Sequence, residues 1–384
     1  MKPIPLAGPD ITSQERRAVL EVLKSPILSR GPKLYEFEKH LSAYVGRRYA
    51  VAVNSGTSAL HLAIKAYNIG DGDHVITTPL SFIASSNCIL FERAVPVFVD
   101  IKKDTYCIDP GLVEEKIKEL KKRKKRVKAI LAVDMFGYLA DWGRLRALAN
   151  RYNLILIEDS CEALGSYKKR RGEKRMAGSF GDVGIFGFYP NKQITTGEGG
   201  ALLTNDKKIA DLARAIRNHG ASPRGRWSDY RMLGYNYHIS DIHCALGTAQ
   251  LKRIGTILSR KIRVAELYTK CLHHSSLIHT PLIPPAGTHL SHYIYLTRLA
   301  DHFSREQRDL VIKKLQKYHI ASRDYFPPIH LSYFYQKKFG YRHGDFPVAE
   351  YMMDHALALP FFNALTEKQI EYICTILQGI LKRL

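Results

Sequence analysis

The stretch Leu154-Ile155-Leu156-Ile157-Glu158-Asp159 decides the fold class of this chain, because it is apolar on both faces until its acidic end. Continuous apolar strands separated by helices are typical of a parallel sheet that helices cover on both sides. Similar apolar runs occur at residues 49–53, 74–77, 95–100, 127–133, 183–188 and 201–204. Helical spacing separates several of them, at residues 58–67, 82–91 and 142–152. The sequence therefore predicts one large α/β domain between about residues 20 and 250.

The pattern changes after Leu251, where a long helical pattern runs to Cys271. Several prolines, an alternating stretch at residues 292–297, a Pro-rich turn at 327–328 and helical patterns at 305–318 and 367–381 follow. We therefore expect a large domain over residues 1–250 and a smaller α+β domain over residues 251–384. The N-terminal segment is expected to pack on the smaller domain.

Composition excludes several classes of protein. The chain has 384 residues, of which 45% are hydrophobic and 24% charged, which is the profile of a globular protein rather than a disordered or disulfide-stapled one. No stretch approaches the roughly 20 apolar residues of a membrane-spanning helix, and residues 1–5 lack the apolar run of a secretion signal. Six scattered cysteines form no CxxC pair. We expect a cytoplasmic protein with free thiols, no membrane association and no metal site.

The net charge of +22 favours anionic partners such as nucleic acid, acidic lipid or phosphorylated ligands. Much of it lies in the basic run at residues 116–126, which is also typical of a solvated helix end and loop. No RNP-like aromatic motif, zinc-finger spacing or heptad run accompanies the charge, so the sequence does not support a dedicated nucleic-acid reader.

Ligands of parallel sheets collect beyond the carboxyl ends of the strands, so the residues that follow each strand are candidates for a site. After the strand at 49–53 come Ser55, Gly56 and Thr57 at the start of a helix. Free N–H groups and the helix dipole make such a helix start an anion site, most naturally for phosphate, although Ser and Thr also cap helices that bind nothing.

Two further predicted strands are followed by side chains that could take part in chemistry. Asp159 ends a buried strand, where a carboxylate needs a cation or hydrogen-bond donors, or else caps the next turn. Lys192 lies in a loop rich in Gly and Thr between two apolar strands. A desolvated lysine there would be a nucleophile toward a carbonyl, whereas an ordinary loop lysine would lie on the surface.

These features together match what pyridoxal phosphate requires. The helix start at Ser55 would hold the phosphate, and Phe82 would stack on the ring. Asp159 would keep the pyridine nitrogen protonated, and Lys192 would form an imine with the aldehyde.

The chain resembles the DegT-type (DegT/DnrJ/EryC/StrS) sugar-nucleotide aminotransferases, which are fold-type-I pyridoxal phosphate enzymes, over essentially its full length. The resemblance rests on residues 30–32, 53–60, 79–82, 96–100, 158–159, 192–200, 233–237 and 245–251. It implies a large domain with a mixed, mostly parallel sheet flanked by helices, and a homodimer with active sites at the subunit interface. It also implies that Gly56 and Thr57 bind the cofactor phosphate and that Asn236 reaches the phosphate of the neighbouring subunit.

Three positions depart from the common family pattern. Gly187 stands where a Ser often contacts the phosphate, and His238 stands where Arg is common. Glu162 stands where Gln or His often meets the ring oxygen, so its carboxyl would have to be protonated or turned aside. Because Lys192 is retained, and is not replaced by the His of related dehydratases, the resemblance predicts transamination.

The resemblance implies transfer of an amino group from an amino acid to a nucleotide-diphosphate-linked keto-sugar, in amino-sugar or surface polysaccharide biosynthesis. Glutamate is the expected donor. Lys192 would move the proton as general base and then general acid. His330 matches a family stretch near the active site and is a candidate substrate contact. Two alternatives stay open: a regulatory or nucleic-acid-binding protein on the same scaffold, and another pyridoxal phosphate reaction such as lyase or racemase chemistry.

Overall fold

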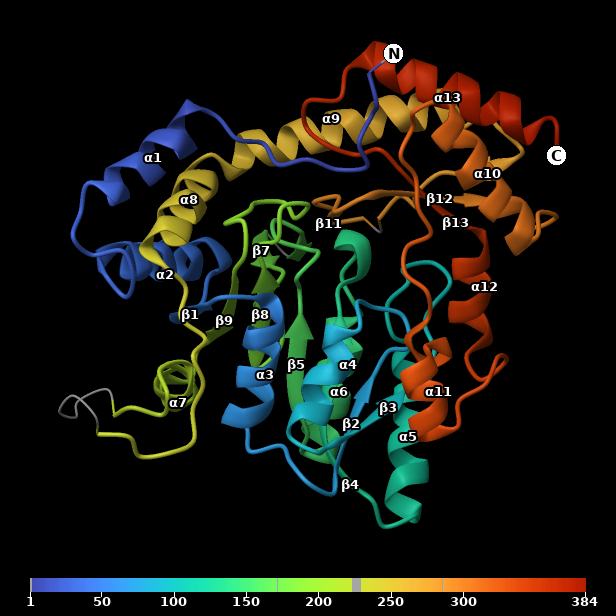
Figure 1. Ribbon diagram of the computed structural model, residues 1–384. Coiled ribbons are helices and arrows are strands. Elements are labelled where there is room, and N and C mark those ends of the chain that lie inside the picture. The colour runs from blue at the N-terminus through green and yellow to red at the C-terminus, as the bar shows by residue number, and fades with distance from the viewer. Residues whose placement is uncertain (1, 171, 223–228, 285) are drawn as a thin grey trace.

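The computed structural model describes residues 2–170, 172–222, 229–284 and 286–384. A seven-stranded sheet forms its centre (Figure 1), in the order β1 (Tyr49–Val53), β9 (Gly200–Thr204), β8 (Val183–Gly187), β5 (Ile155–Asp159), β4 (Arg126–Val133), β2 (Asp73–Thr77) and β3 (Val95–Phe98). The strands from β8 to β3 are parallel, whereas β9 is antiparallel to both β8 and β1. This confirms the predicted mixed, mostly parallel sheet.

Helices connect the strands of this sheet and cover it (Figure 1): α3 (Gly56–Ala66), α4 (Ala84–Phe91), α5 (Pro110–Lys122), α6 (Trp142–Tyr152) and α7 (Lys207–Arg217). Strand β4 is buried over residues 129–133 and β5 over residues 156–159, as their continuous apolar pattern predicts. The carboxyl ends of the parallel strands consequently face one edge of the sheet.

The remaining elements lie mostly beyond that edge and along the α5 side (Figure 1). The helices are α1 (Ser13–Leu23), α2 (Pro32–Val45), α8 (Asp241–Lys252), α9 (Ile254–Leu272), α10 (Arg305–Lys317), α11 (Tyr333–Phe339), α12 (Pro347–His355) and α13 (Glu367–Leu381), with 3-10 turns at Met135–Gly137 and Ile329–Leu331. An antiparallel sheet joins β10 (Ile278–His279), β12 (Tyr295–Leu299) and β13 (Ala356–Leu359). Another joins β11 (Thr288–His289), β6 (Tyr167–Arg170) and β7 (Glu173–Met176).

The long helix predicted for residues 251–271 is confirmed as α9 (Ile254–Leu272), but residues 251–252 belong to the end of α8. The structure breaks the helical pattern at Arg253, whose φ of −117° lies outside the helical region. The Arg253 guanidinium pairs with Asp10 at 2.6 Å and with Glu15 at 2.5 Å. The apolar periodicity alone does not indicate this break between α8 and α9. It occurs at Arg253, the residue that pairs with Asp10 and Glu15 of the N-terminal segment.

The N-terminal segment packs where β12 and α13 meet. Ile4 is buried in one apolar cluster with residues of α9, β12 and α13, and its N–H donates to the His319 carbonyl at 2.8 Å. The apolar cluster formed by the central sheet and its helices, however, also includes Tyr293 and Leu296 from beyond residue 250. A domain boundary at residue 250 stays a prediction. No helix within the described ranges is long and apolar enough to cross a membrane.

Candidate active site

A cavity of about 790 Å³ opens at the carboxyl ends of the parallel strands. Its lining comes from the segments that follow β1, β2, β5 and β8, and from residues 323–327 of the C-terminal part. The lining includes seven residues that the sequence predicted for the site: Ser55, Gly56, Thr57, Phe82, Asp159, Glu162 and Lys192. The topology thus brings together side chains from four separate connections of one sheet.

The start of α3 forms an anion cradle at this cavity. Ser55 is its N-cap in extended backbone conformation, and its hydroxyl accepts a hydrogen bond from Ser58 N at 3.0 Å. The N–H groups of Gly56 and Thr57 lie in the first turn, where an α-helix provides them with no intrahelical acceptor. Together with the helix dipole, they suit a phosphate.

Three glycines allow the backbone around this cradle to pack closely. A Cβ on Gly200 would lie 2.3 Å from the Ser55 carbonyl oxygen, and one on Gly56 would lie 3.2 Å from the Gly187 Cα. Gly187 and Gly200 are paired residues of β8 and β9. The cradle therefore depends on backbone contacts that side chains at positions 56 and 200 would disturb.

Asp159 is held as a hydrogen-bond acceptor at the end of β5, with only 3% of its surface exposed. Its Oδ2 accepts from the Ser85 hydroxyl at 2.7 Å, and its Oδ1 accepts from Cys161 N at 3.1 Å. Ser85 in turn contacts the Ser81 hydroxyl at 2.8 Å. This arrangement fixes a carboxylate at the cavity wall, where a protonated ring nitrogen would complete its contacts.

Lys192 projects into the cavity with 14% of its side chain exposed. Its Nζ lies 3.6 Å from Glu162 Oε1 and 4.1 Å from the centre of the Tyr293 ring. The neighbouring Asn191 donates from Nδ2 to the hydroxyls of Tyr293 at 2.9 Å and Tyr325 at 3.2 Å. The lysine is therefore a held amine near the core, as predicted from its position between two apolar strands.

Glu162, the predicted departure from the family pattern, turns toward Lys192. Its Oε2 accepts from Phe136 N at 3.0 Å. Burial raises the pKa of the Glu162 carboxyl, while the Lys192 charge and the Phe136 N–H oppose that rise. A second lysine, Lys261, lies nearby, with its Nζ 3.4 Å from the Tyr293 carbonyl oxygen. Burial lowers the pKa of Lys261 to about 7, and the charge of Lys192 adds a smaller effect in the same direction.

An aromatic wall faces the cavity beside these groups. Phe82 is 57% exposed, and its ring centre lies 6.1 Å from that of Phe326. Tyr189, 53% exposed, also lines the cavity. An exposed aromatic ring at a cavity suits stacking on a planar ligand.

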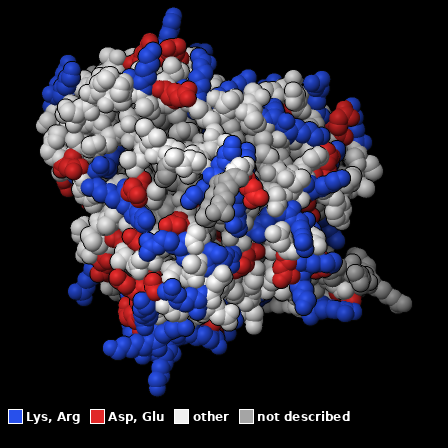
Figure 2. All heavy atoms as spheres, turned by 180° about the vertical axis from the view of Figure 1, so that it is seen from behind, with Lys and Arg blue, Asp and Glu red and all other residues white. Residues whose placement is uncertain are grey.

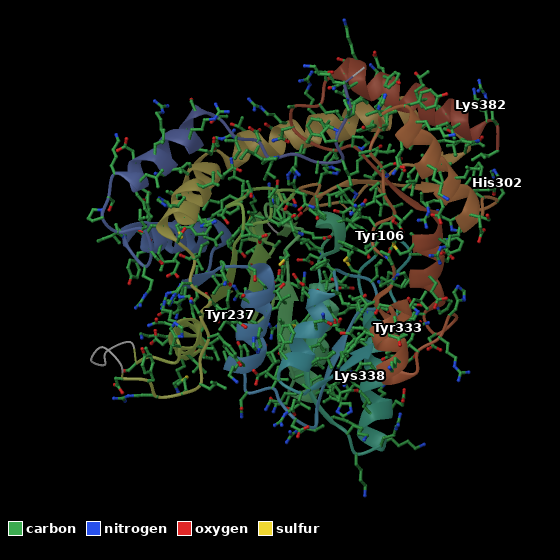
Figure 3. The ribbon with its side chains drawn as sticks, viewed as in Figure 1. Tyr106, Tyr237, His302, Tyr333, Lys338 and Lys382 are labelled. Atoms are coloured by element: carbon green, nitrogen blue, oxygen red, sulfur yellow. The ribbon has the colours of Figure 1, made fainter. Side chains whose placement is uncertain are left out.

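Asn236 lies outside the lining of this cavity, and its side chain is exposed. The tyrosines on either side are fixed: Tyr237 OH lies 2.8 Å from His61 Nδ1, and Tyr235 OH donates to Glu92 at 3.2 Å. Figure 3 shows Tyr237 beside α3, toward the β1 edge of the sheet, whereas Tyr333 and Lys338 of α11 lie toward the β3 edge. Asn236 is thus held at the surface.

The structure does not bring His330 to the cavity. Its side chain is fully buried, its Nε2 lies 2.8 Å from Glu350 Oε1, and its ring packs at 4.7 Å from that of Phe346. His330 therefore packs against α12, and the prediction that it contacts substrate has no support here. His330 follows residues 323–327, which line the cavity, by only a few positions, but its own side chain is buried in the core.

Several residues at the site could not be found from the sequence. Ser85 holds Asp159, and Tyr293 and Tyr325 contact the Lys192 loop from the C-terminal part of the chain. A serine within a helical pattern and tyrosines in loops carry no local signal for such contacts. Arg323 and Phe326 were missed for the same reason.

The basic run lies far from this cavity. Residues 121–126 are all exposed at the end of α5 and the start of β4, at the opposite edge of the sheet, where Figure 2 shows a dense group of Lys and Arg. These residues form an exposed helix end and loop, and the role of the run stays a prediction. The run therefore makes no contact with a ligand in the cavity.

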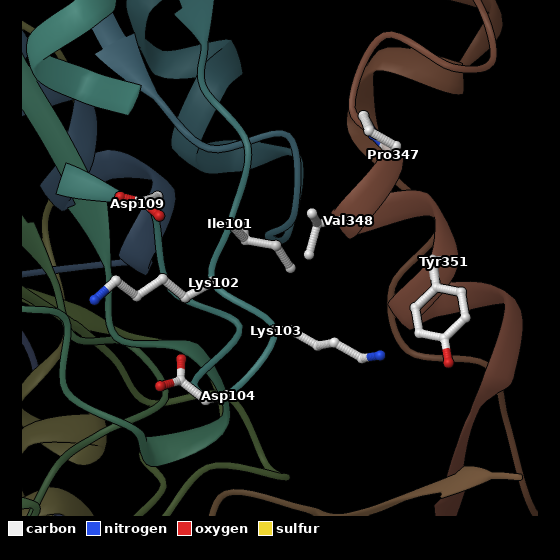
Figure 4. A pocket seen from close by; sticks show the side chains of 8 residues that line it. All are labelled: Ile101, Lys102, Lys103, Asp104, Asp109, Pro347, Val348 and Tyr351. Atoms are coloured by element: carbon white, nitrogen blue, oxygen red, sulfur yellow. The ribbon is translucent and has the colours of Figure 1, made fainter. Parts of the chain in front are cut away.

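A second hollow of about 610 Å³ lies between residues 101–109 and α12 (Figure 4). Lys103 there points toward the Tyr351 ring, with its Nζ 4.4 Å from the ring centre. It contains none of the residues predicted for the site. The strand-end cavity is therefore the candidate active site.

Comparison with known proteins gives the same assignment. The family model of the DegT/DnrJ/EryC1/StrS aminotransferase family matches residues 9–378. The chain belongs to this family. It is accordingly a pyridoxal-phosphate-dependent aminotransferase, and the fold-type-I prediction is confirmed.

Relatives of this aminotransferase cover its whole length. It is 37% identical over 383 residues to the GDP-perosamine synthase of Caulobacter vibrioides, which spans 98% of both chains. Its structure matches Helicobacter pylori PseC, an aminotransferase involved in the biosynthesis of pseudoaminic acid, with a TM-score of 0.91, 27% identity and 100% of both chains covered. A Streptococcus pneumoniae relative solved in its PLP form matches with a TM-score of 0.90, 29% identity and 99% of both chains covered.

The residues of this aminotransferase fit the cofactor. The cradle at Gly56 and Thr57 suits its phosphate, Asp159 suits its ring nitrogen, and the Lys192 amine lies in the same cavity. The side-chain oxygen of Asn191, a residue of the cavity lining, is buried without a hydrogen-bond partner among the described residues. Pyridoxal phosphate thus has an anion site, an acid and an amine at one cavity.

Proposed function

We propose that this aminotransferase moves an amino group from an amino acid to a nucleotide-diphosphate-linked keto-sugar, with glutamate as the expected donor. The observation that carries the proposal is the cavity in which Lys192, Asp159 and the α3 cradle converge. At about 790 Å³ it lies in the upper part of the size range of small-molecule sites. The relatives named GDP-perosamine synthase and PseC support a sugar acceptor.

The cofactor supplies a temporary store for the amino group and for the electrons released when the donor's alpha proton leaves. Gly56 and Thr57 bind its phosphate with their N–H groups, and the Ser55 hydroxyl caps the same turn. Asp159, oriented by Ser85, keeps a proton on the ring nitrogen. Phe82 limits the position of the ring by stacking.

Lys192 is the proton carrier in this proposal. When donor or acceptor is bound, the Lys192 amine would be free to accept the proton from the donor's alpha carbon. It would then return that proton to the carbon of the cofactor's aldehyde group. Glu162 and the Tyr293 ring, at 3.6 Å and 4.1 Å, keep that amine in the cavity. Because the same residues serve both halves of the reaction, the amino donor and the sugar bind in turn.

We also propose a homodimer in the cytoplasm, in which Asn236 of one copy reaches the phosphate of the other. Its exposed side chain and fixed tyrosine neighbours support this role. The separation of the basic run from the cavity leaves the nucleic-acid-binding alternative without support at this site.

The test of the function is covalent trapping at Lys192. Protein incubated with pyridoxal phosphate should be yellow, and borohydride should fix the cofactor's mass on the peptide that carries Lys192. Lys192→Ala should remove both signals, whereas Lys208→Ala, an exposed lysine on α7, should retain them. Trapping at another lysine, or no trapping, would refute the assignment.

The reaction type needs a second measurement. Glutamate should bleach the yellow colour and yield one equivalent of keto acid, and a nucleotide-linked keto-sugar should restore the colour as an amino sugar forms. Carbon dioxide, ammonia or a racemised amino acid as the main product would identify the alternative pyridoxal phosphate chemistries.

A further inference from the structure

The candidate active site contains a cation that the proposed chemistry does not use. Among the described residues that line the cavity, the basic side chains are Lys192 and Arg323, and the acidic ones are Asp159, Glu162, Glu198 and Asp324. Lys192 is committed to the cofactor. The donor carries carboxylates and the acceptor carries a diphosphate, so a further positive group in or beside this cavity would favour substrate binding.

The main chain fixes Arg323 at the cavity. Arg323 N donates to the Ala358 carbonyl of β13 at 3.3 Å, and Ala358 N donates to the Arg323 carbonyl at 2.8 Å. Two residues further along, Tyr325 OH accepts from Asn191, the neighbour of Lys192. Arg323 is thus tied to the small sheet on one side and, through Tyr325, to the catalytic loop on the other.

The Arg323 side chain is exposed and pairs with no carboxylate in the described part of the chain. The adjacent carboxylate, Asp324, lies 4.0 Å from the buried guanidinium of Arg308 instead. An arginine at a cavity without a partner of its own is available for a ligand. Its planar fork of donors matches a carboxylate or a phosphate with two parallel hydrogen bonds.

We propose that Arg323 binds an oxyanion of the substrate, and that this oxyanion is the diphosphate of the nucleotide sugar. The donor's alpha carboxylate is bonded directly to the reacting carbon and must lie deep beside Lys192, which is only 14% exposed. The diphosphate is several bonds from the reacting carbon of the sugar, and the exposed Arg323 side chain suits that more distant position. This inference rests on the proposed function.

The test compares Arg323→Met, which removes the charge, with Arg323→Lys, which keeps the charge but not the fork. Arg342→Met, at an exposed arginine outside the cavity lining, is the matched control. Binding of uridine diphosphate and of guanosine diphosphate to each protein is measured by calorimetry at two salt concentrations. The glutamate and keto-sugar half-reactions are followed separately by absorbance.

We expect the nucleoside diphosphate that binds the parent protein to bind Arg323→Met about tenfold more weakly, with a smaller salt dependence. The KM of the keto-sugar half-reaction should rise by a similar factor while its maximal rate is retained, and Arg323→Lys should lie between. A defect confined to the glutamate half-reaction would assign Arg323 to the donor carboxylate and refute the diphosphate contact. Binding and both half-reactions equal to those of Arg342→Met would overturn the proposal.

The calorimetric arm separates this inference from the proposed function. If no amino donor bleaches the parent protein, aminotransfer as proposed fails. A loss of diphosphate binding in Arg323→Met would still establish the anion contact.

Discussion

Gly187→Ser should tighten the binding of pyridoxal phosphate. Gly187 ends β8 beside the α3 cradle and lines the cavity, at the position where the family resemblance predicts a serine. A Cβ there would lie 3.4 Å from Cys161 Sγ and 3.7 Å from the Gly56 Cα, which are ordinary contact distances. The new side chain therefore fits, and its hydroxyl would lie close to the N–H groups that bind the phosphate.

The size of the effect follows from one added hydrogen bond to a charged group. Such bonds stabilise by about 1.5 kcal/mol at the lower end of their range, which corresponds to a roughly tenfold lower Kd. Gly187→Ala is the matched control, because it adds the Cβ without the hydroxyl. We expect it to bind the cofactor within about twofold of the parent protein, since the contacts at 3.4–3.7 Å leave room for the methyl group.

The assay is a titration of cofactor-free protein with pyridoxal phosphate, followed by the absorbance of the bound form. Circular dichroism shows whether each variant is folded like the parent. A Gly187→Ser protein that is folded but binds the cofactor no more tightly than Gly187→Ala would refute the placement of the phosphate at the start of α3.

Gly200, Asp159 and Glu15 allow three further tests. Gly200→Ala should weaken cofactor binding at least tenfold in the same titration, because its Cβ would lie 2.3 Å from the Ser55 carbonyl oxygen; unchanged affinity would contradict the cradle. Asp159→Asn keeps the shape but removes the charge, so the glutamate half-reaction should slow roughly 100-fold, and full activity would argue against a protonated ring nitrogen. Burial opposes ionisation of Glu15, but hydrogen bonds from neighbours including Arg253 outweigh it and lower its pKa from 4.5 to about 2. Glu15 therefore stabilises the fold above pH 4.5 and loses that contribution as the pH falls toward 2. Glu15→Gln should cost about 3 kcal/mol of unfolding free energy in urea at pH 7, and a difference that persists at pH 2 would refute this.

The placement of the catalytic groups could be predicted from the sequence because it depends on local order along the chain. Apolar runs mark buried strands, and the carboxyl ends of parallel strands must meet at one edge of the sheet. Asp159 and Lys192 follow two such runs, and Ser55 follows a third, so their convergence required no knowledge of packing. The phosphate cradle was predictable for the same reason, since a helix start exposes its N–H groups whatever surrounds it.

Packing between distant segments decided the rest. Ser85 hydrogen-bonds Asp159 across 74 residues, and Tyr293 lies over Lys192 from a segment about 100 residues away. His330 follows a motif-like stretch yet is buried against Glu350, and Arg323 reaches the cavity only because its main chain pairs with β13. Periodicity reports which face of an element is apolar, but not which partner covers that face. The contacts that orient the reacting groups are therefore set by the tertiary structure alone.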